Sequence, residues 1–365
     1  MINSWWVALY NPPMKRLIIA LTIFALVSVA PAQTAKSSLT RLLEAELSRF
    51  PAKAGVYVKH LKTGEEAGVR ADEAFNSFSV IKLSILTMAY NLAEQKKLRL
   101  DERVEIRRSM VRDGSGIFQY HDYGLAPTIR DVLTEMVITS DNTATDIMVD
   151  KVGGFVQLNQ WVASAGYPNV RMLQHGWEWR RKVMAMVDQR FKDLPAEQIV
   201  GLMYAMGNNA LFSRYAELFT GSRQELVSTV RSEAFRTSYN QVRDKYLSND
   251  SNFWLGTMTP HDIGRMLEAI ETGTIASKES CDEMKAILLR QQAGTRRIPH
   301  FLNVPVGHKT GDGPPNIAND VGIVYARSGP IVISFFTSNN TGPYAELEDR
   351  IGQASKKIVD YFDGR

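Results

Sequence analysis

Two residues at helical spacing form the first chemically suggestive pair in the sequence. Ser79 and Lys82 are three positions apart, which places two side chains on one face of a helix. A partly desolvated lysine amine can accept the proton of a neighbouring serine hydroxyl, which is otherwise a weak nucleophile at neutral pH. The pair predicts a nucleophile and its base, although one Ser-x-x-Lys is expected about once by chance in a chain of this size.

Two later motifs could supply a proton relay and an anion site. Ser140-Asp141-Asn142 combines a hydroxyl that can pass on a proton with a carboxamide that can hold a substrate amide. A helix N-cap by Ser140 or Asp141 is the alternative. In His308-Lys309-Thr310-Gly311, an ammonium and a hydroxyl suit a substrate carboxylate, and glycine permits close backbone approach. Lys62-Thr63-Gly64 repeats the last three letters, but it lies in an expected hairpin turn, where we predict a structural role.

The ordered set of Ser-x-x-Lys, Ser-Asp-Asn and Lys-Thr-Gly resembles the motifs of class A β-lactamases and penicillin-binding proteins. The context is also similar to the class A pattern, because Ser-Asp-Asn-Thr-Ala leads into Val152-Gly153-Gly154 and Asn319-Asp320-Val321-Gly322 follows the lysine motif. The resemblance covers nearly all of the chain after residue 32, except roughly residues 180–252. It implies a serine β-lactamase that needs neither a metal nor a cofactor.

The resemblance also implies a role for each motif residue. Ser79 would be acylated, Lys82 would manage its proton, and Ser140 would deliver a proton to the departing lactam nitrogen. The remaining groups would bind the substrate. Asn142 would hold the amide of the substrate's side chain, and Lys309 and Thr310, beside Gly311, would bind the substrate's carboxylate. The backbone amides of Ser79 and Asp312 would form the oxyanion hole.

The chain departs from the class A pattern where a glutamate normally activates the hydrolytic water. The segment 171–180 stands where Arg-x-Glu-x-x-Leu-Asn is expected, and Glu178 is the best candidate for the base. Burial between its two flanking tryptophans would make this carboxylate a stronger base. The alternative is a packing segment with an ion pair from Glu178 to Arg180 or Arg181. Ala318 occupies a position where an arginine is sometimes found, so another basic residue would have to help bind the carboxylate.

Hydrophobic periodicity indicates the elements that position these motifs. Helical spacing occurs in the ranges 39–50, 83–97, 128–139, 144–152, 155–165, 260–272, 278–291 and 344–362. Strand patterns occur at 55–69, 304–309, 321–326 and 331–337. Strands near both chain ends with helices between them predict an α/β (α+β) fold: an antiparallel sheet flanked by helices, built from both ends, with an inserted all-helical domain. This is the β-lactamase/transpeptidase-like architecture.

The domain boundaries follow from these patterns. Residues 33–78 and 255–365 are expected to form the sheet domain, and residues 79–254 the helical domain. Helical spacing at 194–206, 211–219 and 224–238 predicts an ordered insert at about 180–252, since compact Ω-loops hold only roughly 6 to 16 residues. Such an insert near the active-site mouth would act as a lid, narrow the substrate range or bind another protein.

The start of the chain has the pattern of a signal peptide. Lys15 and Arg16 precede an apolar run and then Ala30-Pro31-Ala32, which predicts a peptide of residues 1–32. The run is too short to cross a bilayer comfortably, so a retained anchor is the less favoured alternative and Met14 an alternative start. We expect an exported protein, periplasmic or secreted, without an intrachain disulfide because Cys281 is the only cysteine.

Composition narrows the possible partners. The formal net charge is +4, and the sequence contains no long Lys/Arg run, which disfavours nucleic-acid binding. The six histidines show no metal-ligand spacing. We therefore expect a monomer that acts on a small-molecule β-lactam, without metal or cofactor. Three alternatives stay open: a D-alanyl-D-alanine peptidase, another serine amidase or esterase, and a slowly deacylating penicillin-binding or sensor protein.

Overall fold

The computed structural model describes residues 36–364, so the predicted signal peptide lies outside the described residues. Within the described part of the chain, no helix has the length and apolar character needed to cross a bilayer.

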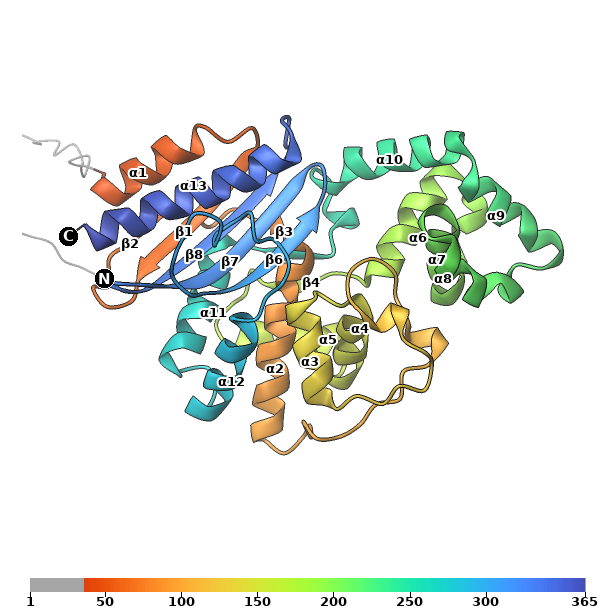
Figure 1. Cartoon of the computed structure of the whole chain (residues 1–365), viewed down its shortest axis with the longest axis horizontal. Helices are drawn as coiled ribbons and strands as arrows, with labels where there is room; N and C mark the ends of the chain where they lie inside the picture. The colour runs from red at the N-terminus through yellow and green to blue at the C-terminus, as the bar shows by residue number, and fades with distance from the viewer. Residues whose placement is uncertain (1–35, 365) are drawn as a thin grey trace, which may run out of the picture. The chain divides into compact units, whose positions relative to one another are not determined.

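Five antiparallel strands form the main sheet, in the order β2-β1-β8-β7-β6 (Figure 1). They are β1 (Lys53–His60), β2 (Glu66–Val69), β6 (Val306–Gly313), β7 (Ile317–Ala326) and β8 (Gly329–Ser338). The first strand pairs with the last along its whole length, which confirms a sheet built from both chain ends. The turn between β1 and β2 contains Lys62-Thr63-Gly64, as predicted.

The last hairpin is longer than its sequence pattern indicated. β6 continues through the Lys-Thr-Gly motif to Gly313, and β7 begins at Ile317 instead of Val321. The extra residues are paired, with Gly311 opposite Asn319. Because these residues are polar or small, their pairing left no hydrophobic alternation in the sequence.

Alternate residues of the sheet pack against different helical layers. On one face the strands contribute to a core with α1 (Ser38–Leu47) and α13 (Tyr344–Asp363). On the other face they join a core with α11 (Pro260–Thr272) and α12 (Lys278–Leu288). Figure 1 shows α1 and α13 on one side of the sheet and α11 and α12 on the other.

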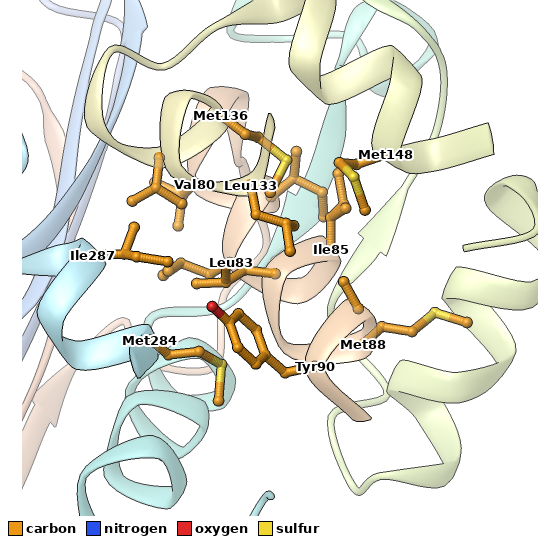
Figure 2. Close-up of a cluster of buried hydrophobic side chains, with 14 of the residues drawn as sticks. Val80, Leu83, Ile85, Met88, Tyr90, Leu133, Met136, Met148, Met284 and Ile287 are labelled. Carbon is orange, nitrogen blue, oxygen red and sulfur yellow. The ribbon is translucent and has the colours of Figure 1, made fainter. Parts of the chain in front are cut away.

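The helix that carries Lys82 is buried on all sides. In α2 (Lys82–Glu94), every side chain from Lys82 to Tyr90 is buried. Figure 2 shows part of this core, in which Leu83 and Ile85 of α2 lie among side chains of neighbouring helices, including Leu133, Met148 and Ile287. The neighbouring helices are α3 (Ile129–Ile138), α4 (Asn142–Lys151), α5 (Gly154–Ser164) and α12. Such close packing on every side resists displacement of α2 and fixes the start of the helix.

A second, three-stranded sheet lies close to the start of α2 and was not predicted. Its order is β3 (Phe75–Asn76), β5 (Gly256–Met258) and β4 (Arg171–Met172). The backbone N–H of Ser77 donates to the carbonyl of Gly256 at 2.9 Å, which extends this pairing toward Ser79. Strands of two or three residues are too short to show a periodicity.

The insert is helical, but its boundaries differ from the prediction. It contains α6 (Gly176–Val187), α7 (Ala196–Gly207), α8 (Asn209–Phe212), α9 (Gln224–Arg231) and α10 (Glu233–Leu247). The helix expected at 211–219 is α8 followed by a 3₁₀ segment, and the helix expected at 224–238 is two helices separated at Ser232. The backbone of Ser232 is extended, and its side chain accepts the N–H of Phe235 at 3.2 Å as an N-cap.

The insert packs around its own hydrophobic core, and Figure 1 shows α6 to α10 grouped together. Two residues from elsewhere belong to the same core: Phe78, directly before Ser79, and Ile317 at the start of β7. The insert therefore contacts both the turn that carries the serine and the end of the Lys-Thr-Gly hairpin.

Candidate active site

Ser79 lies in a 3₁₀ turn, Phe78–Ile81, that leads directly into α2. Phe78 has a φ of +44°, in the left-handed region that costs a non-glycine residue about 1 kcal/mol. β6 passes so close to this turn that a Cβ on Gly311 would lie 2.6 Å from the Ser77 carbonyl oxygen. Glycine at this position therefore allows the Lys-Thr-Gly strand to lie against the serine turn.

Lys82 is buried and points toward the Ser-Asp-Asn motif. Its Nζ donates to the Ser140 carbonyl at 2.6 Å, to the Ser140 hydroxyl at 3.0 Å and to Asn142 Oδ1 at 3.1 Å. Burial lowers the pKa of Lys82 well below its usual value, and the positive charge of Lys309 lowers it further. A lysine in this environment loses its proton more readily than an exposed lysine and can then serve as a base.

Ser140 lies between two lysines. Its hydroxyl oxygen accepts from Lys82 Nζ and from Lys309 Nζ, each at 3.0 Å. While both amines donate, the hydroxyl's own proton remains available for a third group. Lys309 is fully buried, and this burial lowers its pKa to about 8. The arrangement can pass a proton from a lysine through Ser140 to a substrate atom.

The other two positions of the Ser-Asp-Asn motif have separate functions. Asp141 is the N-cap of α4 and accepts the backbone N–H of Ala144 at 2.9 Å, which confirms the N-cap alternative for this residue. Asn142 donates its amide to the Asp113 carbonyl at 2.9 Å. Its side chain therefore links Lys82 to the loop before α3.

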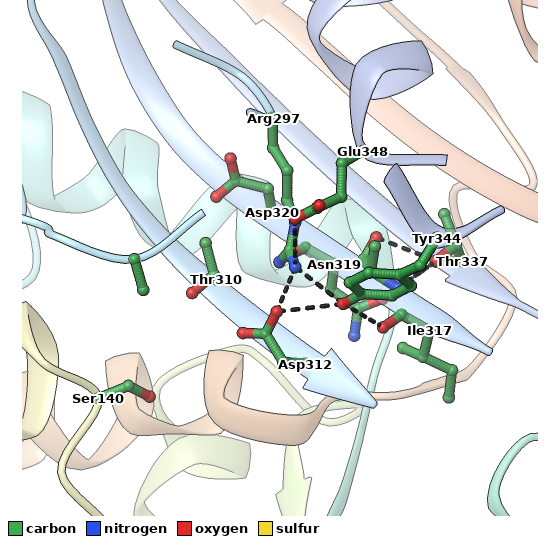
Figure 3. Close-up of polar contacts among 12 residues, drawn as sticks. Ser140, Arg297, Thr310, Asp312, Ile317, Asn319, Asp320, Thr337, Tyr344 and Glu348 are labelled. Carbon is green, nitrogen blue, oxygen red and sulfur yellow. Dashed lines mark hydrogen bonds and ion pairs between the residues drawn. The ribbon is translucent and has the colours of Figure 1, made fainter. Parts of the chain in front are cut away.

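A buried arginine supports the Lys-Thr-Gly strand from behind. Arg297 donates to the carboxylate of Asp312, and also to the Tyr344 hydroxyl at 2.9 Å and the Asn319 carbonyl at 2.7 Å (Figure 3). Burial acts to raise the pKa of Asp312, but the charge of Arg297 outweighs it and the pKa lies below the usual range. The Thr310 hydroxyl is buried and has no hydrogen-bond partner within residues 36–364, so it can take one from a ligand.

One cavity of about 490 Å³ brings most of the predicted residues together. Its walls include Ser79, Lys82, Ser140, Asn142 and Asp312. Lys309 reaches the same place through Ser140, although it does not line the cavity itself. The insert contributes five further lining residues: Gly176, Trp179, Arg180, Arg243 and Leu247.

Glu178 lies in the first turn of α6, and its carboxylate accepts the backbone N–H of His175 at 2.9 Å. The carboxylate thus caps the helix. Within the described residues it forms no ion pair with Arg180 or Arg181, because Arg180 pairs with Asp113 instead. Glu178 is half-buried next to cavity residues but is not itself part of the lining.

Besides Asp312, a second aspartate lines the cavity, and sequence reasoning missed it. Asp146 stands one turn after Asn142 on α4; its oxygens accept from His175 Nδ1 at 2.8 Å and from Arg112 Nε at 2.5 Å. Burial acts to raise the pKa of Asp146, but the hydrogen bond from His175 and the charge of Arg112 outweigh it and the pKa is lowered. The four-residue spacing from Asn142 was the available signal.

Comparison with known proteins identifies the family. The profile of the beta-lactamase enzyme family matches residues 35–362. The chain belongs to this family. Beta-lactamase L2 of Stenotrophomonas maltophilia is 30% identical over 135 residues, which are 37% of this chain and 43% of that protein. Beta-lactamase 3 of Bacillus cereus is 23% identical over 317 residues, which cover 85% of this chain and 77% of that protein.

Several proteins with solved structures have the same fold. An ancestral class A beta-lactamase matches with a TM-score of 0.66 at 19% identity. The match covers 89% of this chain and 100% of that one. PBP-A has a TM-score of 0.63 at 22% identity, with 90% of this chain and 97% of that one covered. The alignments to the first two curated relatives span 43% and 42% of those proteins, less than half of their length.

Proposed function

We propose that this beta-lactamase-family hydrolase opens the amide of β-lactams through an acyl-enzyme on Ser79. The observation that supports this most directly is the Ser140 hydroxyl, which accepts hydrogen bonds from both Lys82 and Lys309 in the cavity that Ser79 lines. The arrangement joins a base, a proton relay and a nucleophile around one space.

Acylation begins when neutral Lys82 takes the proton of Ser79. The Ser79 oxygen then bonds to the lactam carbonyl carbon, and the negative charge on the carbonyl oxygen is stabilised by the backbone N–H groups of Ser79 and Asp312. As the carbon–nitrogen bond breaks, Ser140 gives its proton to the nitrogen and receives one from Lys82. Lys82 is neutral again after this step.

Two groups hold the substrate during this reaction. Lys309 and Thr310, next to Gly311, bind the carboxylate of the β-lactam, and Asn142 binds the amide of its side chain. The ammonium of Lys309 is buried and the Thr310 hydroxyl has no partner among residues 36–364, so both can donate a hydrogen bond to a carboxylate. The protein acts as an exported monomer, without metal or cofactor.

Deacylation requires a base for the attacking water, and we assign this role to Glu178. Water bonds to the ester carbon as its proton passes to the base. The bond between this carbon and the Ser79 oxygen then breaks, and the proton is passed on to that oxygen, so the base is a carboxylate again. The helix-capping position of Glu178, outside the cavity lining, favours a second candidate: a D-alanyl-D-alanine peptidase, another serine amidase or esterase, or a penicillin-binding sensor that deacylates slowly.

A chromogenic cephalosporin, mixed with purified residues 33–365, separates these candidates. We expect sustained hydrolysis that Ser79→Ala reduces by a factor of at least about 10⁴. A single stoichiometric burst, with an adduct in the intact mass, would favour the slowly deacylating protein or the peptidase. No reaction and no adduct would contradict β-lactam chemistry.

A further inference from the structure

The insert places an arginine beside the residue assigned to the substrate's side-chain amide. Arg180 belongs to the second turn of α6 and lines the cavity, and its side chain is 15% exposed. A Cβ on Gly114 would lie 3.0 Å from Arg180 Nη2 and 2.9 Å from Asn142 Nδ2. A Cβ on Gly176 would lie 3.1 Å from Arg180 Nη1. Two glycines thus make room for the guanidinium next to Asn142.

The hydrogen-bonding capacity of Arg180 is almost unused. Its Nε lies 2.8 Å from Asp113 Oδ2 and forms an ion pair with it, but the two groups are not aligned as a hydrogen bond. Arg180 Nε and Asp113 Oδ1 are both buried and have no hydrogen-bond partner among residues 36–364. The two terminal amino groups form no hydrogen bond with a residue in the range 36–364, and unlike Nε they are not fully buried. A guanidinium carries five N–H donors, and buried donors are normally satisfied. With Nε facing Asp113, the terminal amino groups are available to a ligand in the cavity.

The other two arginines of the cavity are committed to nearby groups. Arg112 donates to Asp146 at 2.5 Å and to the Ser109 carbonyl at 2.8 Å. Arg243 donates to Asp244 at 2.8 Å. Within the described part of the chain, Arg180 is thus the cavity arginine whose Nε is buried without a hydrogen bond.

The surface around Arg180 suits an acyl group with both an apolar and an anionic part. The guanidinium carbon lies 5.6 Å from the centre of the Trp179 ring, and Trp179 lines the cavity together with Met172 and Leu255. An aryl or alkyl group can pack against these side chains, while a carboxylate attached to it accepts two parallel hydrogen bonds from the guanidinium.

We propose that Arg180 forms a subsite for a carboxylate on the acyl side chain of the substrate. This inference rests on the proposed function and defines its substrate class: β-lactams with two carboxylates, one bound by Lys309 and Thr310 and the second by Arg180. The insert is then a specificity element for anionic acyl groups.

The test uses two penicillins that differ by one carboxylate, benzylpenicillin and its α-carboxy derivative carbenicillin. We expect a higher kcat/KM for carbenicillin, and Arg180→Gln should reduce the carbenicillin-to-benzylpenicillin ratio by about tenfold or more, mostly through KM. Arg181→Gln is the matched control, because Arg181 is the next residue on α6 and lies over Trp177 instead of lining the cavity. Its ratio should equal that of the unchanged protein.

A second variant changes the ratio in the opposite direction. Asp113→Asn removes the carboxylate that competes for Arg180, so carbenicillin should gain severalfold relative to benzylpenicillin. An equal loss for both penicillins in Arg180→Gln would indicate a structural role and overturn the subsite.

Binding to a Ser79→Ala background separates this inference from the proposed function. Calorimetry with both penicillins, with and without Arg180→Gln, requires no turnover. A preference for carbenicillin that depends on Arg180 would support the subsite, whether or not the unchanged protein hydrolyses penicillins. If the unchanged protein hydrolyses neither penicillin, that failure would contradict only the proposed function. Equal affinities for the two penicillins in the Ser79→Ala protein would overturn the subsite.

Discussion

The two sides of the cavity differ in how completely their polar groups are satisfied. On the side built from α2, α4 and β6, Lys82 has three hydrogen-bond partners and Lys309 has two, and the Thr310 hydroxyl is the motif group left without one among residues 36–364. On the insert side, Arg180 Nε and Trp179 Nε1 are buried without a partner among residues 36–364. A network that is already satisfied holds its groups ready for one reaction, whereas free donors remain for whatever group the substrate brings. The first side is therefore suited to chemistry and the second to recognition.

The two sides also differ in anchorage. α2 is enclosed by other helices of the main core, whereas α6 to α10 pack mainly on one another. The insert also reaches the reaction centre: a Cβ on Gly313 would meet the Phe78 ring at 2.6 Å and Leu247 of α10 at 3.1 Å. Changes on the α2 side should thus affect the chemical step, and changes in the insert should affect selectivity and stability.

The largest effect is expected from the base on the α2 side. Lys82→Met keeps the length of the side chain but removes the proton acceptor, so the rate of Ser79 acylation should fall by about 10³-fold. Stopped-flow measurement of the burst with a chromogenic cephalosporin gives this rate. Lys97→Met, an exposed lysine just beyond α2, is the control and should acylate normally. Rapid acylation of Lys82→Met would show that another group takes the proton.

Glu178 lies on the insert side, but we assign it a role in the chemistry. Substitution of this residue separates a catalytic from a structural role. Glutamine can still accept the His175 N–H as a helix cap, but it cannot act as a base. If Glu178 activates water, Glu178→Gln should slow deacylation by about 10²-fold, and the acyl-enzyme should persist in the intact mass. Unchanged turnover would mean that this glutamate only caps α6.

The sequence predicted the α2 side of the cavity better than the insert side. The motif residues were recognisable because each set is local, and the central strands were recognisable because Val321 and Ile323 alternate with residues that face the other layer. The polar contacts that complete the site join distant segments, as in Asp146 with His175 and Arg297 with Asp312. No local pattern in the sequence predicts such a contact.

The insert was the region where prediction was weakest, for physical reasons. Its apolar residues cover one another in several short helices, so periodicity indicated helix but placed the ends poorly. The α6 helix was missed because its first turn combines tryptophans with charged residues. The break before α10 did have a signal, since Ser232 precedes Glu233 in the manner of an N-cap.

The pH dependence of binding tests the buried ammonium of the first side. Burial lowers the pKa of Lys309 to about 8, so its positive charge is present below that pH and is lost above it. Binding of benzylpenicillin to the Ser79→Ala protein should therefore weaken roughly fivefold between pH 8 and pH 9. Lys309→Arg should remove this decline, because a guanidinium keeps its charge. An affinity that is constant over this range would contradict a role for the Lys309 charge in binding.

The smallest effect concerns the stability of the insert. Ser232→Ala removes the N-cap of α10 and should cost about 1 kcal/mol of unfolding free energy. Ser228→Ala is the matched control, because this exposed serine lies inside α9 and caps nothing. If the insert unfolds together with the rest, both thermal and urea unfolding of Ser232→Ala should remain single transitions, shifted to lower values. A separate early transition, with cephalosporin hydrolysis retained and the preference for carbenicillin lost, would instead show that the recognition side can unfold while the chemical side stays intact.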